Sequence, residues 1–209
     1  MTLRRWRGLL GIAGGAGAGL AAMAWATDGF RALTLDAARG AAVASTPRPV
    51  PPVVLVDEAT DAPVRFGDGA VTIVDFVSTS CEAICVAQGA RFGTLQAALQ
   101  GRAAAAGAAP IRLLTISFDP DDDARRLDAW RAVRGADPAW WRVVRVAPAD
   151  RRALLDTFQV TVVRDPIAGW RHNAAFHLVD PAGRLARIIP ADEPERALRT
   201  ADSLAGWRR

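Results

Sequence analysis

Runs of apolar residues separated by mixed polar segments predict buried strands alternating with helices. The stretches VTIVDFV at 71–77 and IRLLTISF at 111–118 are apolar and β-branched, which is typical of strands buried on both faces. Shorter apolar stretches predict three further strands, at 53–56, 63–66 and 142–146. Helices are expected after the strands, at 82–101, 119–133 and 148–158.

The last part of the chain predicts a β-hairpin and a closing helix. Two strand-like segments, 174–179 and 184–189, flank the turn sequence DPAG at 180–183, and a helix is expected over 193–205. Because crossover helices join parallel strands, this order predicts an α/β fold with a mostly parallel central sheet, to which the C-terminal β-hairpin adds antiparallel strands. We assign this domain to residues 53–209.

The N-terminal residues 1–27 have the pattern of a membrane anchor or signal segment. Arg4, Arg5 and Arg7 precede residues 8–26, which carry no charge and as a helix would span roughly 28 Å. The basic flank places the domain outside the cytoplasm, which predicts a bacterial inner-membrane protein facing the oxidising periplasm. The length favours a retained anchor, while Ala24-Trp25-Ala26 leaves a cleaved secretory signal as the alternative.

Residues 28–52 are expected to be a spacer. Four prolines lie at 47–52 and favour an extended conformation, and a short helix is expected at 34–44.

Composition excludes several classes of protein. A chain that is 51% hydrophobic with a net charge of +4 is not intrinsically disordered, and two cysteines cannot build a disulfide-rich scaffold. The 26 basic residues, all arginine, nearly balance 22 acidic residues and form no run interleaved with aromatics. We therefore expect no nucleic-acid partner.

The candidate chemistry lies at Cys81 and Cys85, directly after a predicted buried strand. Residues four apart share one helix face, so both sulfurs can reach one ion or pair as a disulfide. A helix N-terminus is expected to lower a thiol pKa, and two thiolates suit a soft ion such as Cu(I). A catalytic thiol pair and a structural disulfide remain alternatives, although so short a bridge stabilises little.

A third metal ligand has to come from elsewhere, and the chain contains two histidines. His172 lies in an expected loop before the hairpin, where it can face the end of a neighbouring strand. His177 alternates with apolar residues of an expected strand and is predicted to pack or face solvent. We therefore favour His172 as the ligand.

Three segments in order give the chain a family resemblance. The sequence VDFVSTSCEAIC at 74–85, the sequence ISFDP at 116–120 completed by Asp123, and His172 followed by LVDPAG at 178–183 resemble motifs of the Sco/SenC family. These are membrane-tethered, thioredoxin-like proteins of cytochrome c oxidase assembly. The resemblance covers roughly residues 50–205.

This resemblance implies a thioredoxin-like fold that binds one copper ion, Cu(I) or Cu(II), through Cys81, Cys85 and His172. It also implies a partner, the binuclear copper site of cytochrome c oxidase subunit II or a related copper protein. One departure is visible, because Glu82 replaces the proline that usually follows the first cysteine. We hypothesise that Glu82 is a solvated surface residue, or that it tunes the site by raising the thiol pKa or by supplying a weak oxygen ligand to oxidised copper.

Three functions remain open at this stage. A copper metallochaperone needs both cysteines and His172, whereas a thiol-disulfide oxidoreductase needs Cys81 and Cys85 as catalytic residues but not the histidine. A peroxidase of the thioredoxin superfamily has no support beyond the cysteines. Asp119 and Asp123 are expected to cap the helix that follows them, with a supporting role near the metal as the alternative for Asp119.

Overall fold

The computed structural model describes residues 15–25, 29, 34–57, 63–81, 84–106, 110–165 and 169–206 of the 209-residue chain. Residue contacts divide the chain into two units, Met1–Ala42 and Val43–Arg209. Residues 15–25 of the first unit are helical. None of the helices within the described residues is long and apolar enough to cross a membrane. Residues 8–14 and 26 of the expected anchor lie outside the described residues.

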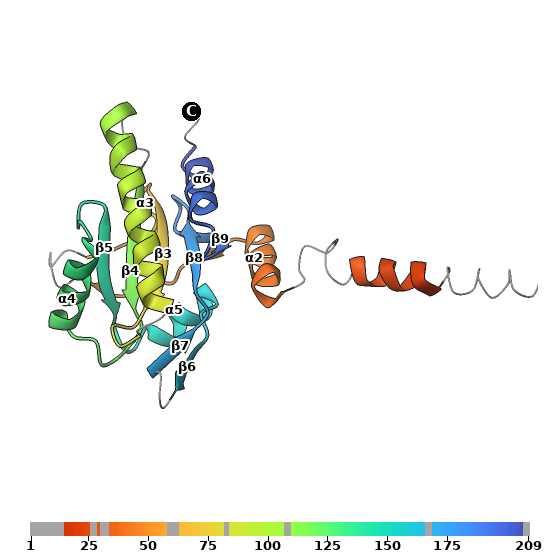
Figure 1. Ribbon diagram of the computed structural model, residues 1–209, viewed down its shortest axis with the longest axis horizontal. Helices are drawn as coiled ribbons and strands as arrows, with labels where there is room; N and C mark the ends of the chain where they lie inside the picture. Colours follow the sequence, from red (N-terminus) through yellow and green to blue (C-terminus); the bar gives the residue numbers. More distant parts are fainter. Residues whose placement is uncertain are drawn as a thin grey trace, which may run out of the picture. The chain divides into compact units, whose positions relative to one another are not determined.

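Strands and helices alternate through most of the second unit, as Figure 1 shows. The elements are, in chain order, α2 (Leu35–Ser45), β1 (Arg48–Pro49), β2 (Leu55–Val56), β3 (Val71–Val77), α3 (Ile84–Ala106), β4 (Ile111–Ser117), α4 (Ala124–Arg134), β5 (Trp141–Val146), α5 (Arg151–Phe158), β6 (Val162–Asp165), β7 (Gly169–His172), β8 (Ala175–Val179), β9 (Arg184–Pro190) and α6 (Pro194–Leu204). The expected helix at 34–44 and the expected hairpin of β8 and β9 are confirmed.

The main sheet is mixed, so the prediction of a mostly parallel sheet is wrong. Its strand order among the described residues is β1-β9-β8-β3-β4-β5-β2. Among the strands that the structure describes, the parallel pairings are those of β3 with β4 and of β4 with β5. The terminal hairpin enters the sheet by placing β8 antiparallel beside β3, and β1 and β2 close the two edges in antiparallel pairings.

Two local predictions also differ from the structure. Residues 63–66 do not form a strand, because β2 already occupies the open edge of β5 through Leu55↔Val146. The segment around His172 is not a loop but the second strand of a separate two-stranded sheet, β6-β7. The histidine is therefore placed by a strand ladder.

Alternation along β3 divides the hydrophobic core into two clusters, one on each face of the sheet. Val71, Ile73 and Val77 pack in the cluster that contains residues of α3 and α6. Val74 and Phe76 pack in the second cluster, with residues of α5. Figure 1 shows α3 and α6 side by side on one face. Since side chains alternate along a strand, Asp75 faces α3, the helix that carries Cys85.

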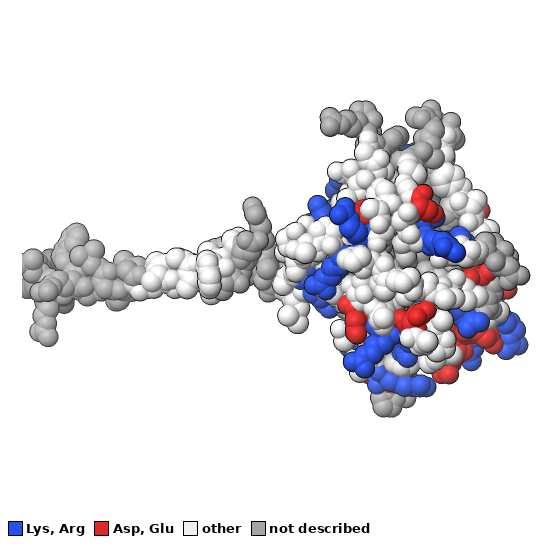
Figure 2. All heavy atoms as spheres, turned by 180° about the vertical axis from the view of Figure 1, so that it is seen from behind, with Lys and Arg blue, Asp and Glu red and all other residues white. Residues whose placement is uncertain are grey.

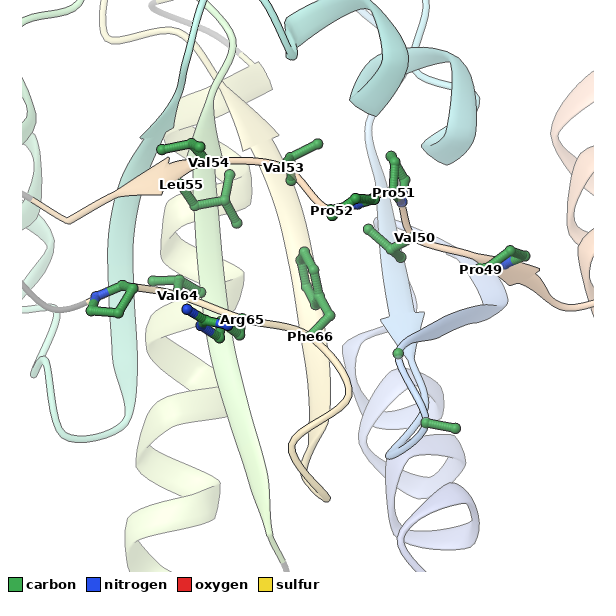
Figure 3. A pocket seen from close by; sticks show the side chains of 13 residues that line it. Pro49, Val50, Pro51, Pro52, Val53, Val54, Leu55, Val64, Arg65 and Phe66 are labelled. Atoms are coloured by element: carbon green, nitrogen blue, oxygen red, sulfur yellow. The ribbon is translucent and has the colours of Figure 1, made fainter.

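A largely apolar groove of about 540 Å³ lies between the segments 49–55 and 63–66 and the turn at 182–183 (Figure 3). Its side chains are valines, prolines, Leu55 and Phe66, with Arg65 as the one charged residue in its lining. It contains none of the cysteines or histidines. The chemistry of the chain therefore lies elsewhere.

Arginine and acidic side chains are interspersed on the face of the second unit that Figure 2 shows. Several arginines pair with carboxylates, as in Arg142 with Asp57 at 2.6 Å and Arg102 with Asp202 at 2.9 Å.

Candidate metal centre

Cys81 and Cys85 lie where β3 passes into α3, as their sequence context predicts. The backbone N–H of Cys81 donates to the carbonyl of Ser78 at 3.2 Å, which holds Cys81 in the turn before the helix. Cys85 lies in the first turn of α3, and its backbone N–H points at the Cys81 sulfur, 3.4 Å away. Both thiols are buried, with exposures of 6% and 0%.

His172 completes a group of three donors. Its Nε2 lies 3.4 Å from the Cys85 sulfur, and its ring packs edge-on against Phe118 with centroids 5.2 Å apart. The two sulfurs and an imidazole nitrogen all lie within 4.8 Å of one another. One ion placed among them can therefore contact all three donors.

The protonation state of His172 favours metal binding, whereas that of Cys85 opposes it. Burial lowers the pKa of His172, so its imidazole is neutral at pH 7 and keeps a lone pair for a metal. The hydrogen bond with Cys81, followed by burial, raises the pKa of Cys85. The expectation that the helix N-terminus lowers this pKa is therefore wrong for Cys85. A metal ion has to displace the thiol proton, and its binding releases protons.

Two aspartates hold the loop that carries the cysteines. Asp119 accepts hydrogen bonds from the hydroxyls of Ser78 at 2.7 Å and Ser80 at 3.2 Å. Burial alone would raise the pKa of Asp119, but these bonds and those from the Asp121 backbone and Trp170 lower it. Asp119 therefore supports the loop next to Cys81 as a carboxylate.

Asp122 plays a similar part that the sequence did not reveal. It is 4% exposed and accepts hydrogen bonds from the backbone and the hydroxyl of Thr79 and from the hydroxyl of Ser117. The sequence does contain a signal for these hydrogen bonds, because a run of serine and threonine follows β3 and a run of aspartates follows the neighbouring strand β4. Asp123 is the N-cap of α4, as expected, and accepts from the Arg126 N–H at 2.8 Å.

His177, the other histidine of the chain, lies outside this group. His177 is on β8, 1% exposed, and packs edge-on against Phe76 and Phe158 in the second cluster. It therefore packs on the sheet face opposite the cysteines. Glu82 lies outside the described residues, so its hypothesised tuning role stays a prediction.

The described fold is thioredoxin-like, and its site combines two sulfurs with one imidazole nitrogen, the donor set of a soft-metal centre. The chain belongs to the SCO1/SenC family, whose model matches residues 58–205. A comparison with curated proteins gave no significant match.

Solved structures of low sequence identity share the fold. A SCO1/SenC family lipoprotein from Bacillus anthracis is 20% identical with a TM-score of 0.65, covering 77% of this chain and 98% of the lipoprotein. BsSco, a Sco family cytochrome c oxidase assembly protein with a disulfide switch, is 21% identical with a TM-score of 0.64, covering 78% and 96%. Copper-bound ScoI of Bradyrhizobium japonicum is 20% identical with a TM-score of 0.58, covering 74% and 98%.

Proposed function

We propose that this chain is a copper-binding metallochaperone for the binuclear copper site of cytochrome c oxidase subunit II or a related copper protein. The observation that carries the proposal is the convergence of Cys81, Cys85 and His172 within 4.8 Å. The match to the SCO1/SenC family supports it, as do a relative that is an oxidase assembly protein and another that holds copper.

The three residues have separate parts in holding the cargo. Cys81 and Cys85 supply soft sulfur donors that favour Cu(I) once their protons leave. His172 supplies a neutral nitrogen, and its Nδ1 lies 3.3 Å from the Asn173 carbonyl, which directs Nε2 toward Cys85. Because His172 is half-buried while both thiols are buried, the imidazole side is the side from which a partner would approach.

The placement of the protein is part of the same proposal. Residues 8–26 would anchor it in the bacterial inner membrane, residues 28–52 would act as the spacer, and residues 53–209 would face the periplasm. The basic residues before position 8 support this orientation. Retention of the anchor is tested by the mass of the protein recovered from membranes, which contains residues 1–27 only if they are not cleaved.

Copper stoichiometry of the reduced, full-length chain tests the proposed site. We expect one copper per wild-type chain and at least tenfold weaker Cu(I) binding in His172→Ala, measured against a chromophoric Cu(I) chelator. His177→Phe is the matched control, because it removes the other histidine and keeps an aromatic ring beside Phe76 and Phe158. It should bind copper as the wild type does.

The partner is tested by mixing the copper-loaded chain with the metal-free copper domain of oxidase subunit II and following copper in each protein. Transfer to that domain, lost in His172→Ala, is the expected result. A wild-type chain that binds no copper but reduces disulfides equally well with or without His172 would instead be a thiol-disulfide oxidoreductase.

A further inference from the structure

Arg134, the last residue of α4, is a partly buried cation that forms no ion pair with a carboxylate of the described residues. Its guanidinium carbon lies 4.0 Å from the centroid of the Trp130 ring, and its Nη1 donates to the Trp130 carbonyl at 3.3 Å. Its buried Nε has no hydrogen-bond partner among the described residues, and no described carboxylate forms an ion pair with it. A buried charge is costly unless an opposite charge lies near it.

Gly89 fixes where this cation lies relative to the cysteines. A Cβ atom built on Gly89 would lie 2.4 Å from the Arg134 Nε and 2.6 Å from its Cδ, so the arginine crosses α3 where a side chain is missing. Gly89 is four residues after Cys85 and therefore on the same helix face, about 6 Å away. The Arg134 Nε thus lies at most about 8 Å from the Cβ of Cys85.

The ionisable groups that interact with Arg134 are the two cysteines of the candidate site and one carboxyl group. Burial lowers the pKa of Arg134, and negative charge on Cys85, Asp75 and Cys81 acts to raise it. Asp75 is fully buried, which raises its pKa to about 7, so it supplies only part of a charge at neutral pH. The larger negative charge near Arg134 arises when both cysteines are thiolates.

We propose that Arg134 is the counter-charge of the copper-loaded site, a positioning residue that makes the site selective for Cu(I) over Cu(II). This inference rests on the proposed function. Two thiolates and a neutral imidazole around Cu(I) carry one net negative charge, whereas the same donors around Cu(II) are neutral. A fixed positive charge one helical turn away stabilises the first complex and leaves the second nearly unaffected.

Replacing Arg134 by methionine separates these two cases in the full-length reduced chain. At about 8 Å and an effective dielectric constant of about 20, loss of the charge should weaken Cu(I) binding by about tenfold or more. Cu(II) binding should change by less than about threefold. The one-electron reduction potential of the bound copper should then fall by about 59 mV for each tenfold selective loss.

Matched variants separate charge from structure. Arg134→Lys keeps the charge and should restore most of the Cu(I) affinity and the potential. Arg131→Met removes an arginine from the same helix that pairs with Asp128 instead, and it should leave both quantities unchanged.

Two glycine substitutions, one of them a control, test the position of the Arg134 charge without removing that charge. Gly89→Ala puts a methyl group where the Arg134 side chain lies, and should weaken Cu(I) binding by displacing the guanidinium. Gly93→Ala, one turn further along α3, meets nothing within 4 Å and should have no effect.

An Arg134→Met chain that loses Cu(I) and Cu(II) affinity equally, or that keeps its Cu(I) affinity, would overturn the counter-charge role while leaving the proposed function intact. A wild-type chain that binds neither ion would overturn both.

Discussion

Asp75 is a carboxyl group enclosed by protein in the middle of β3. It is 0% exposed, and its Oδ1 accepts from the Thr115 hydroxyl at 2.5 Å, which in turn accepts from the Trp141 indole at 2.8 Å. Burial raises its pKa from 3.8 to about 7. Between about pH 4 and pH 7, the folded protein therefore keeps this carboxyl group protonated, whereas the unfolded chain has released the proton. The stability that this proton contributes is complete below pH 4 and is lost as pH rises through 7.

Asp75→Asn should remove this loss. The stability difference between the variant and the wild type should be small at pH 4 and grow in favour of the variant, by up to roughly 4 kcal/mol, by pH 8. Urea unfolding of the reduced, metal-free proteins at both pH values measures it. Asp119→Asn should differ from the wild type by nearly the same amount at pH 4 and pH 8, because the lowered pKa of Asp119 contributes stability that is lost only below about pH 4. A difference for Asp75→Asn that is equal at pH 4 and pH 8 would contradict the assignment.

At the scale of elements, α4 depends on the two residues that flank it. Asp123 caps its N-terminus, and Gly135 ends it in a left-handed conformation with φ of 62°. The same helix holds Arg134 near the cysteines, so its ends bear on the site as well as on the fold.

Asp123→Ala should destabilise the protein by about 1 kcal/mol, because the Arg126 N–H loses its acceptor. Chemical denaturation measures the change in the free energy of unfolding. Asp128→Ala, an exposed position within the same helix, is the control and should cost about 0.5 kcal/mol or less. Equal effects of the two changes would show that the cap contributes nothing.

The elements that the sequence predicted well are those with a strong local pattern. β3 was predicted with its exact bounds because all seven of its residues are buried and six are apolar or β-branched. The β6-β7 hairpin was missed because its strands have four residues each, are mostly half-exposed or exposed, and carry no apolar alternation. The C-terminal hairpin adds antiparallel strands to the sheet as predicted, but its place beside β3 was not predicted, because pairing of distant strands leaves no local signal.

The residues of the candidate site also differ in how well the sequence predicts them. The spacing of Cys81 and Cys85 and the short list of histidines were sufficient to name the three donors. Asp122 and Arg134 could not be predicted, because each reaches the site from another element through contacts that only the fold creates. Spacing reveals donors that are close in sequence, whereas supporting charges come from anywhere in the chain.

At the scale of the whole molecule, a metal at this site would connect distant segments. Cys85 and His172 are 87 residues apart in sequence, and they belong to α3 and to the separate β6-β7 sheet. An ion held by both would therefore act as a cross-link that exists only in the folded chain.

Copper loading should consequently raise the melting temperature of the reduced wild-type chain. With free copper about 1,000-fold above the dissociation constant, the gain in stability is about 4 kcal/mol. His172→Ala should show a smaller gain, since one end of the cross-link is missing. Thermal unfolding with and without a Cu(I) chelator measures both, and an identical gain in the two proteins would exclude His172 from the cross-link.

The β6-β7 ladder joins four residue pairs, from Val162↔His172 to Asp165↔Gly169. Neighbouring side chains of a strand point to opposite faces, so a slip of one residue turns the imidazole away from the sulfurs altogether. A paired ladder allows no intermediate orientation of this side chain. The register of four residue pairs therefore determines whether His172 reaches the metal position at all, while β3 and α3 hold the two thiols in place independently of it.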